Sequence, residues 1–544
     1  MIKTIKELEK YLSEKLNAFD INQELIANFS NIENVDIQFN QLIALKSHES
    51  FGEISHSIIK TLNELEIIEK CELTQQGFIN INLSDKFFHL NISNNKEELL
   101  NKLKNQSGKI VLDYGGANIG KSLHVGHLRT LTIGRSLKNI YRMSGYDVIS
   151  DIHFGDWGMP IGLILALIEE KNININTLTS SDLEIIYPEA VLLAKNNESF
   201  KEKAQEYSKK LNENNKDAIK QWKVIYELST SNLISFLNKI NFEFDLYKGE
   251  SDVVELIPDL INSLKENNLV KLDQGALVAN NNDNPPSIIV KSDGSYIYLT
   301  TDLATVLDRE EKINPDKYIY IVDQRQHQHF DQLFKLVKLF SLSEAEFQHV
   351  GFGTINDKNG KPLKTRDGGN YKLEDLYKDI NNLLESKNSD ENLTTISQSV
   401  LTYSDLVNSR LKNYNFDIEK FTNINGKSAV YIQYSNVRAK KLLSQFEGKL
   451  NLDEILSAHK NILIELIKLE YYFGLALKNN EPHHLAEYMY KLCQEFNTFY
   501  NSEKIFSENK NINQISNDLF LVSCFIQHIE IISECLGIQL VEEM

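Results

Sequence analysis

The feature that most constrains the fold is a short apolar run followed by glycines and a long helical pattern. Residues 109–114 read Lys-Ile-Val-Leu-Asp-Tyr, as expected for a strand buried in a parallel sheet. Gly115, Gly116 and Gly120 follow, and a helical pattern then runs from about residue 125 to 143. This order of elements predicts the first part of a doubly wound α/β domain, whose ligands bind at the carboxyl ends of its strands.

Two further apolar runs, at residues 147–152 and 317–323, predict strands of the same sheet. Between residues 182 and 239 the pattern is helical and highly charged, so we expect a helical insertion at about 165–290. The α/β domain, Rossmann-like in its parallel sheet, is therefore expected at residues 106–385.

The two ends of the chain have a different character. Residues 1–105 mix a helical run at 5–19 with strand-like runs such as 78–83, which predicts an α+β accessory domain. The polar stretch 94–108 is expected to be a connector. Beyond the α/β domain helical periodicity dominates, which predicts an all-α C-terminal domain at residues 386–544.

The sharpest chemical motif is His124-Val-Gly126-His127, placed between the first strand and its helix. Two histidines three residues apart at the start of a helix share one face. Gly126 removes a side chain where a planar ring could approach the backbone. Imidazole donors beside a helix N-terminus make a site for phosphate oxygens. The same motif could arise from two histidines that only cap the helix or lie on the surface. The preceding strand and glycine turn favour the phosphate site.

This motif resembles the HIGH signature of class I aminoacyl-tRNA synthetases, and the longer run DYGGANIGKSLHVGHLR at 113–129 resembles arginyl-tRNA synthetases in particular. Further runs with the same resemblance are HFGDWG at 153–158, YLTTD at 298–302, VDQRQHQH at 322–329, GFGT at 351–354 and GKPLKTRDGG at 360–369. These motifs follow one another in order over nearly the whole chain, which argues against a chance match.

The resemblance implies a second phosphate-binding element, the KMSKS loop, in the last of these runs. Its cations could close over a triphosphate and balance the charge of departing pyrophosphate. The loop taken alone would suit a solvated basic turn, and its position after the HIGH-like motif favours the phosphate role. Asp367 stands where some family members keep a second lysine, and the resemblance implies that Lys121 substitutes for it. The expected catalytic residues are His124, His127, Lys121, Lys364 and Arg366, and the expected ATP contacts are His124, Gly126, His127, Lys364 and Thr365.

A guanidinium substrate needs carboxylates placed for paired contacts, because this planar cation carries five donors and is always charged. Asp113 at the end of the first strand and Asp302 near the start of a helix are suitable, and the compact ammonium of lysine cannot span both in the same geometry. Taken singly, Asp302 would more often be a charge at a helix N-terminus, and Tyr298 a core aromatic. The resemblance implies five arginine-binding residues: Asp113, Asn118, Tyr298, Asp302 and Gln326.

Five neighbouring residues carry weaker expectations: His153, Asp156, Trp157, His327 and His329. Trp157 is a candidate for packing alone. The His-Gln-His run at 327–329 has no identifiable third ligand, so we expect no metal site there and favour a structural role or an adenine-side contact.

Residues 401–445 hold seven Lys and Arg against three Asp and Glu, a local charge of +4 within a chain of net charge −18. Interleaved tyrosines make this composition suitable for single-stranded RNA. A helical domain with an ordinary solvated face is the simpler interpretation of the composition alone. The resemblance implies that the C-terminal domain reads the tRNA anticodon, with contacts from Tyr431, Tyr434 and Arg438, and that the N-terminal domain contacts the tRNA elbow.

The overall composition argues against several other classes of protein. A net charge of −18 is unlike that of a protein that coats nucleic acid, and we expect no DNA partner. There is no run of 18 apolar residues and no signal-peptide pattern, so we expect no membrane insertion. Four widely separated cysteines without a CxxC pair fit a reducing cytoplasm. We expect a monomer.

The resemblance thus implies an arginine–tRNA ligase that uses ATP, with Mg²⁺ on its phosphates, to form arginyl-adenylate and then esterifies the 2′-hydroxyl of the terminal adenosine of tRNA(Arg). Two alternatives remain open. A nucleotidylyltransferase also uses an HxGH motif on a strand–helix turn, although this chain is far longer. A synthetase-like RNA-binding protein without catalysis would keep the fold, although the retained histidines and loop cations speak against it.

Overall fold

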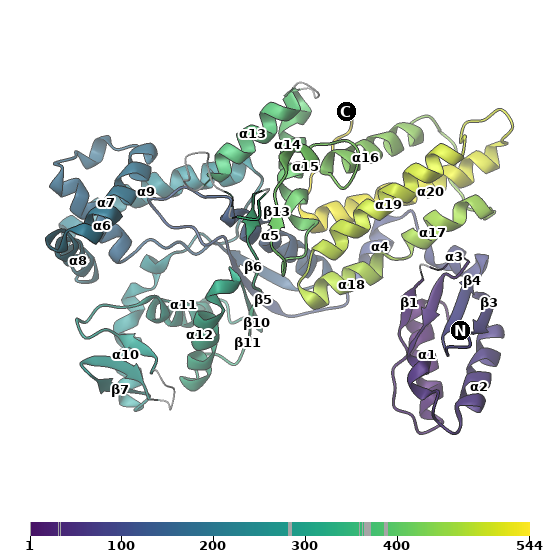
Figure 1. The fold of residues 1–544 in the computed structure, drawn as a ribbon, viewed down its shortest axis with the longest axis horizontal. Helices are drawn as coiled ribbons and strands as arrows, with labels where there is room; N and C mark the ends of the chain where they lie inside the picture. The colour runs from purple at the N-terminus through teal and green to yellow at the C-terminus, as the bar shows by residue number, and fades with distance from the viewer. Residues whose placement is uncertain are drawn as a thin grey trace. The chain divides into compact units, whose positions relative to one another are not determined.

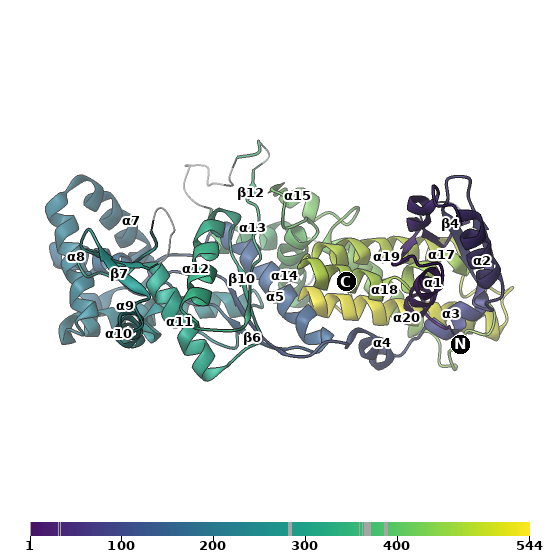
Figure 2. The same cartoon turned by 90° about the horizontal axis from the view of Figure 1, so that it is seen from below.

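The computed structural model describes residues 2–30, 32, 34–280, 286–357, 359–361, 363, 371–385 and 390–544 (Figures 1 and 2). The chain forms two compact units, each built from segments far apart in the sequence. Unit 1 contains residues 1–102, 435–472 and 488–531, and unit 2 contains residues 103–434, 473–487 and 532–544. The C-terminal helices therefore contribute to both units, and the domain boundaries expected near residues 105 and 385 stay predictions.

The N-terminal part of unit 1 combines helices with one antiparallel sheet. Its helices are α1 (Ile5–Asn17), α2 (Phe51–Asn63), α3 (Asp85–Asn91) and α4 (Lys96–Leu103), and its strands are β1 (Ala27–Phe29), β2 (Ile37–Phe39), β3 (Ile68–Leu73) and β4 (Ile79–Leu83). The strands lie in the order β1-β2-β4-β3. The stretch 94–108, expected as a connector, contains α4, which buries Leu99 and Leu103, and the division between the two units falls within it, between residues 102 and 103.

Unit 2 is built around a four-stranded parallel sheet. Its strands are β5 (Lys109–Tyr114), β6 (Asp147–Asp151), β10 (Lys317–Ile321) and β11 (Glu346–His349), and the helices beside them are α5 (Gly126–Ser144), α11 (Tyr298–Lys312) and α12 (His327–Leu339). The strand order is β11-β10-β5-β6, so β6 pairs with one edge of β5 and β10 with the other. The winding therefore reverses between β5 and β10, which is where such sheets bind ligands. The expected doubly wound fold is confirmed.

Helices cover both faces of this sheet (Figure 1). Successive side chains of β5 point to opposite faces. Val111 lies in a core with Leu303 of α11 and Leu333 of α12. Tyr114 faces α5 so closely that a Cβ on Gly134 would lie 2.2 Å from its ring. Burial on both faces explains why these strands are continuous apolar runs.

The segment expected as a helical insertion contains helices and a small sheet. The helices are α6 (Met159–Glu170), α7 (Ser180–Asn196), α8 (Glu198–Asn212), α9 (Lys216–Lys239) and α10 (Ile257–Glu266), and the strands are β7 (Val270–Asp273), β8 (Ala276–Ala279) and β9 (Ile288–Val290). The strands pair antiparallel in the order β7-β8-β9. Strands of three or four residues leave too short a pattern for the sequence to reveal them.

The remaining chain is mostly helical. It contains α13 (Leu373–Glu385), α14 (Asp390–Leu406), α15 (Ile418–Phe421), α16 (Ala429–Leu443), α17 (Lys460–Leu466), α18 (Leu469–Asn479), α19 (His483–Ser502) and α20 (Ile512–Leu536), with a short parallel pair of strands, β12 (Ile355–Asn356) and β13 (Tyr414–Asn415). Among the described residues α20 is long and apolar enough to cross a membrane by length and composition, but 78% of its most apolar window is buried within the protein. It packs as a core helix does.

A buried ion pair joins α5 to α14 within unit 2. The Nε of Arg129 lies 3.0 Å from Oδ1 of Asp405, and the two side chains are 1% and 0% exposed. The guanidinium also donates to the carbonyl oxygens of Gly353 (3.1 Å), Lys412 (2.8 Å) and Ser409 (3.3 Å). One side chain of α5 therefore fixes three other segments of the chain.

Replacing Asp405 with alanine is expected to lower the free energy of unfolding of unit 2 by about 3–5 kcal/mol, because Arg129 then stays buried without its counter-charge. Denaturant titration followed by circular dichroism measures the loss. Glu419→Ala removes an exposed carboxylate and should change the free energy by no more than about 0.5 kcal/mol. Equal effects of the two substitutions would contradict a stabilising role for the pair.

Candidate active site

The turn between β5 and α5 carries the two histidines of the sequence motif, and residues 124–127 are called the HVGH corner below. The ring centroids of His124 and His127 are 4.0 Å apart. The backbone N–H of His124 donates to Nδ1 of His127 (3.1 Å), and that of Gly126 donates to Nδ1 of His124 (3.0 Å). A Cβ on Gly126 would lie 2.7 Å from Cε1 of His124, so the glycine makes room for this ring.

These backbone hydrogen bonds determine which nitrogen of each ring carries a proton. A ring nitrogen that accepts a hydrogen bond has no proton, so each neutral ring is protonated at Nε2. Burial, with the neighbouring His124, lowers the pKa of His127 to about 3. Burial, with the nearby Lys121, also lowers the pKa of His124. At pH 7 the HVGH corner therefore offers two neutral N–H donors.

The chain that follows the second phosphate element pairs with this corner. The backbone N–H of Val125 donates to the carbonyl of Tyr371 (2.9 Å), and the N–H of Leu373 donates to the carbonyl of Leu123 (2.9 Å). Residues 371–373 thus lie beside the HVGH corner. Three expected phosphate contacts lie outside the described residues: Lys364, Thr365 and Arg366.

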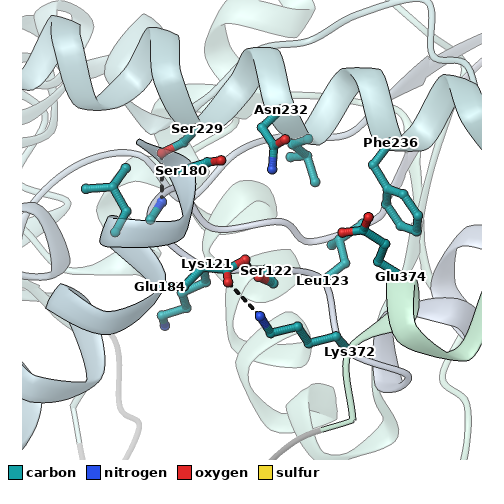
Figure 3. A pocket seen from close by; sticks show the side chains of 13 residues that line it. Lys121, Ser122, Leu123, Ser180, Glu184, Ser229, Asn232, Phe236, Lys372 and Glu374 are labelled. Carbon is teal, nitrogen blue, oxygen red and sulfur yellow. Dashed lines mark hydrogen bonds and ion pairs between the residues drawn. The ribbon is translucent and has the colours of Figure 1, made fainter. Parts of the chain in front are cut away.

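A cavity of about 50 Å³ lies next to the corner, between the turn 120–123 and helices α7 and α9 (Figure 3). Glu184 of α7 pairs with Lys372 (2.6 Å) and accepts a hydrogen bond from Ser122. Lys121 also lines the cavity, and its Nζ lies 4.3 Å from the centroid of the Tyr187 ring. Lysines from both chain segments therefore reach this side of the corner, while the catalytic role of Lys121 stays a prediction.

A second group of polar side chains, Glu250, Tyr298 and Asp302, is called the acidic cluster below. Oδ2 of Asp302 lies 2.6 Å from Nε2 of His329. Burial lowers the pKa of His329, but the hydrogen bond and charge of Asp302 raise it overall. Burial raises the pKa of Glu250 to about 8, and the charge of Asp302 adds to this shift. Glu250 therefore stays protonated at pH 7 until a cation reaches it.

Backbone pairing joins the acidic cluster to the loop that leads into the HVGH corner. Asn118 pairs with Gly155, and Phe154 pairs with Gly249 next to Glu250. The N–H of Glu250 donates to the carbonyl of Phe154 (3.1 Å). The side chain of Asn118 lies over Gly155, where a Cβ would be 2.1 Å from its Oδ1. The two halves of the site are thus built on one set of extended segments.

Asp113 has a partner within the protein. The Arg309 guanidinium lies 2.6 Å from Oδ2 of Asp113 and 2.7 Å from Oδ2 of Asp151, and the arginine side chain is 1% exposed. Asp113 and Asp151 are register partners on β5 and β6, so the three side chains form one buried network at the carboxyl ends of these strands. Asp113 thus neutralises an internal arginine, and its expected contact with a substrate guanidinium stays a prediction.

Asp156 and His153 flank Glu250. Asp156 accepts hydrogen bonds from the backbone N–H (2.9 Å) and the hydroxyl (2.6 Å) of Ser251, and burial raises its pKa to about 6. His153 has a positive φ of 41°, and its Nε2 lies 3.4 Å from Oγ1 of Thr305. The charge of His153 lowers the pKa of Glu250 and that of Asp156 raises it. Both therefore act on the acidic cluster electrostatically.

Three other residues singled out by the sequence, Gln326, Trp157 and His327, differ in exposure and in their hydrogen-bond partners. Gln326 is exposed at the end of a short 3-10 helix after β10. Trp157 is buried and donates to Oδ1 of Asn212 (2.8 Å), which is a packing role. Nδ1 of His327 lies 3.4 Å from Nδ1 of His349, and among the described residues this pair belongs to no group of three metal-ligating side chains.

The expected RNA contacts all lie on α16. Tyr431 is half-buried, and Tyr434 is exposed. Arg438 donates to Oδ1 of Asn497 (2.7 Å), and its guanidinium carbon lies 4.5 Å from the centroid of the Tyr500 ring. These contacts hold Arg438 in place, and the role of all three residues in RNA binding stays a prediction.

Glu250 is the functional candidate that the sequence did not reveal. It stands in the run Gly-Glu-Ser-Asp at 249–252, whose letters suggest an ordinary turn. Its burial arises only when the chain around Phe154 packs beside it, which is a tertiary effect. The partner of Asp113 was hidden in the same way, because Arg309 in the last turn of a helix suggests a C-terminal helix charge.

Three family models match the chain in succession. They are the arginyl tRNA synthetase N terminal domain at residues 5–83, the class I (R) tRNA synthetase catalytic domain at 90–418, and the DALR anticodon binding domain at 432–544. The catalytic model alone covers more than half of the chain.

Curated relatives and solved structures show the same likeness. An arginine–tRNA ligase of Alkaliphilus oremlandii is 34% identical over 532 residues, covering 90% of each chain. The crystal structure of the arginyl-tRNA synthetase of Plasmodium falciparum superposes with a TM-score of 0.82 at 25% identity, covering 100% of both chains. The Thermus thermophilus arginyl-tRNA synthetase, at 18% identity with a TM-score of 0.78 and 100% coverage of both chains, shares the fold.

Proposed function

We propose that this chain, which belongs to the class I arginyl-tRNA synthetase family, joins arginine to tRNA(Arg) while ATP is cleaved to AMP and pyrophosphate. One observation carries the proposal: the HVGH corner and the acidic cluster are built on the same extended segments of unit 2. The corner offers neutral N–H donors suited to phosphate oxygens. The cluster offers carboxylates suited to a guanidinium.

In the first step a carboxylate oxygen of arginine attacks the α-phosphorus of ATP. The bond from that phosphorus to the oxygen bridging to the β-phosphate breaks, and pyrophosphate leaves. The Nε2–H groups of His124 and His127 stabilise the negative charge that grows on the phosphate oxygens. No general base is required, because the attacking carboxylate is already ionised. Positioning and electrostatics therefore supply most of the rate enhancement.

Cations are expected to balance the charge of the leaving pyrophosphate. We assign this role to three residues: Lys121, Lys364 and Arg366. The carboxylates that line the neighbouring cavity, Glu184 and Glu374, are already paired with Lys372 (2.6 Å) and Lys378 (3.2 Å). This side of the site therefore suits a Mg²⁺ ion held mainly by ATP phosphates and water, where it would neutralise phosphate charge.

The acidic cluster recognises the arginine side chain in this proposal. A guanidinium placed between Glu250 and Asp302 favours the ionised form of Glu250. Tyr298 borders the aliphatic stem or donates its hydroxyl, and Asn118 serves the polar end of the amino acid. The ammonium of lysine lacks the planar fork that two separate carboxylates can share, which gives the discrimination.

Arginine binding is expected to strengthen as the pH rises from 6 to 8, by up to about tenfold per pH unit. The pKa of Glu250 is raised to about 8, so below this pH the carboxyl must release a proton before it can pair with the cation. Calorimetric titration in buffers of different ionisation enthalpy measures that proton release. Glu250→Gln should abolish both the release and the pH slope. An unchanged slope in this variant would contradict the role of Glu250.

The second step transfers the arginyl group to tRNA. The 2′-hydroxyl oxygen of the terminal adenosine attacks the carbonyl carbon of arginyl-adenylate, the bond from that carbon to the phosphate oxygen breaks, and AMP leaves. The hydroxyl proton is released to solvent. The match to an anticodon binding model at 432–544 supports tRNA contacts in the C-terminal part. We place Tyr434 and Arg438 in this range and Tyr431 directly before it. A monomer in the cytoplasm is proposed as its working form, and four unpaired cysteines suit that reducing compartment.

Arginine-dependent exchange of labelled pyrophosphate into ATP, measured with and without tRNA(Arg), tests this function. We expect exchange only when arginine and the tRNA are both present. A nucleotidylyltransferase would exchange pyrophosphate with a different acceptor and without arginine. A protein that only binds RNA would show no exchange under any of these conditions, and either outcome would overturn the proposal.

A further inference from the structure

The turn between α18 and α19 brings three metal-ligating side chains together in unit 2. Glu481, His483 and His484 each offer one ligand atom, and these atoms lie within 4.8 Å of one another. Oε2 of Glu481 lies 3.8 Å from Nδ1 of His483 and 3.6 Å from Nε2 of His484. Among the described residues this is the one group of three such side chains. It lies outside the HVGH corner and the acidic cluster.

The two imidazole rings converge although their residues are adjacent in the sequence. Consecutive residues of a helix normally point about 100° apart, so their side chains do not face each other. Here the rings of His483 and His484 lie 4.1 Å apart, centroid to centroid, at the first turn of α19. Their side chains are 15% and 22% exposed, and that of Glu481 is 12% exposed. The local backbone thus directs both rings to one carboxylate oxygen.

The nitrogens that face this oxygen have no hydrogen-bond partner among the described residues. Nδ1 of His483 and Nε2 of His484 are both buried and unpaired. A buried polar atom without a partner is costly, and two of them beside one carboxylate indicate a missing ligand. The distances of 3.6 and 3.8 Å are too long for hydrogen bonds, so Glu481 does not satisfy either ring directly.

The segment that follows α14 holds the carboxylate in position. Oε1 of Glu481 accepts a hydrogen bond from the hydroxyl of Ser409 (3.0 Å), which leaves Oε2 directed at the rings. Next to it, Arg410 donates to the carbonyl oxygens of Asn480 (2.8 Å) and Gly351 (2.7 Å). Hydrogen bonds that orient a ligating carboxylate in this way are typical of the outer shell of metal sites.

We propose that Glu481, His483 and His484 bind a divalent transition-metal ion of the zinc type. Two ligand atoms of tetrahedral zinc, each about 2.1 Å from the metal, lie about 3.4 Å apart, so the two distances from Glu481 to the rings need to shorten by only a few tenths of an ångström. Two imidazoles with one carboxylate suit Zn²⁺ and do not suit Mg²⁺ or Ca²⁺, which take oxygen ligands. Water would supply the fourth ligand. The ion would hold the α18–α19 turn together as a structural site.

A shared proton in place of the metal is the competing explanation. A protonated His483 would direct a donor at Glu481 across 3.8 Å, which is too long for a hydrogen bond. Protonating one ring would also leave the nitrogen of the other ring unpartnered. A metal ion satisfies both nitrogens and the carboxylate oxygen together.

Zinc binding by the full-length chain tests the proposal. The protein is stripped with a chelator and titrated with Zn²⁺ in competition with a chromophoric chelator. Wild type is expected to bind one Zn²⁺ that His484→Gln binds at least about 100-fold more weakly, because loss of a ligand exceeds the 10–100-fold effect of an outer-shell change. The matched control is His56→Gln, which replaces an exposed histidine of α2 and should bind as wild type does. Equal affinity in wild type and His484→Gln would overturn the proposal.

Two further measurements separate this site from misfolding and from the HVGH corner. His484→Gln must keep the far-ultraviolet circular dichroism of wild type, and if it does not, His483→Gln takes its place in the titration. Zn²⁺ should raise the melting temperature of wild type and not that of the variant. The same binding must persist in His127→Gln, since that pair of histidines could also hold zinc. Loss of binding there with retention in His484→Gln would assign the ion to the corner and overturn the proposal.

Discussion

Replacing His127 with alanine is expected to lower kcat for arginyl-adenylate formation by about 100- to 1000-fold, which is the usual cost of one preorganised donor to a transition state. The KM for arginine should change little, because in the proposed site the imidazole faces the phosphates and the guanidinium binds at the acidic cluster. Backbone hydrogen bonding leaves the proton of this ring on Nε2, and burial keeps the ring neutral. Steady-state pyrophosphate exchange in the presence of tRNA measures both constants.

The glutamine variant distinguishes a donor from a packing group. His127→Gln keeps an N–H near the position of Nε2 and should recover part of the lost kcat, whereas alanine should not. The pKa of His127 is about 3, so the ring stays neutral between pH 5 and 8. The pH dependence of activity over this range should therefore have the same shape in wild type and in the alanine variant. A kcat within about threefold of wild type for His127→Ala would remove this residue from the mechanism.

Replacing Asp302 with asparagine is expected to raise the KM for arginine by about 30-fold or more, since losing one partner of a desolvated charge pair costs about 2 kcal/mol or more. The KM for ATP should stay near that of wild type. Asp302 lies 2.6 Å from His329 and its charge acts on the buried Glu250, so its removal withdraws an anion from the whole acidic cluster. Initial-rate measurements with arginine and ATP varied separately give both constants.

Asp331→Asn is the matched control for this substitution. Asp331 lies on α12, pairs with Lys335 at 2.8 Å, and its side chain is 52% exposed, so neutralising it should leave the arginine KM unchanged. Similar effects of the two substitutions on the arginine KM would mean that arginine binding depends on the overall negative charge of the protein and not on the acidic cluster. An unaltered arginine KM in Asp302→Asn would remove Asp302 from the site.

Elements with a strong periodic pattern could be predicted from the sequence. The helix expected at about residues 125–143 is α5, and the apolar runs at 147–152 and 317–323 contain β6 and β10. These elements are buried on most sides, so the pattern of apolar residues in the sequence is enough to identify them. The HVGH corner was recognisable because its chemistry is local: one strand, one turn and one helix bring the two rings together.

The acidic cluster depends on contacts between segments far apart in the chain and was less predictable. Glu250 becomes a buried group only through the pairing of Phe154 with Gly249. Arg309 meets Asp113 because the last turn of α11 packs over the carboxyl ends of β5 and β6. Neither contact leaves a pattern in the residues next to it. Sequence reasoning therefore located the two rings of the HVGH corner, and it missed Glu250 and the internal partner of Asp113.

The central claim is that one site activates a carboxylate at the HVGH corner while carboxylates of the acidic cluster select a guanidinium. The most direct test of this claim compares the charging of tRNA(Arg) with arginine and with citrulline, the uncharged isostere of arginine. We predict efficient charging with arginine and a kcat/KM for citrulline lower by about a thousandfold or more, because a site built to pair a cation rejects an analogue without one. Comparable values for the two amino acids, or no charging with arginine by folded protein, would contradict the claim.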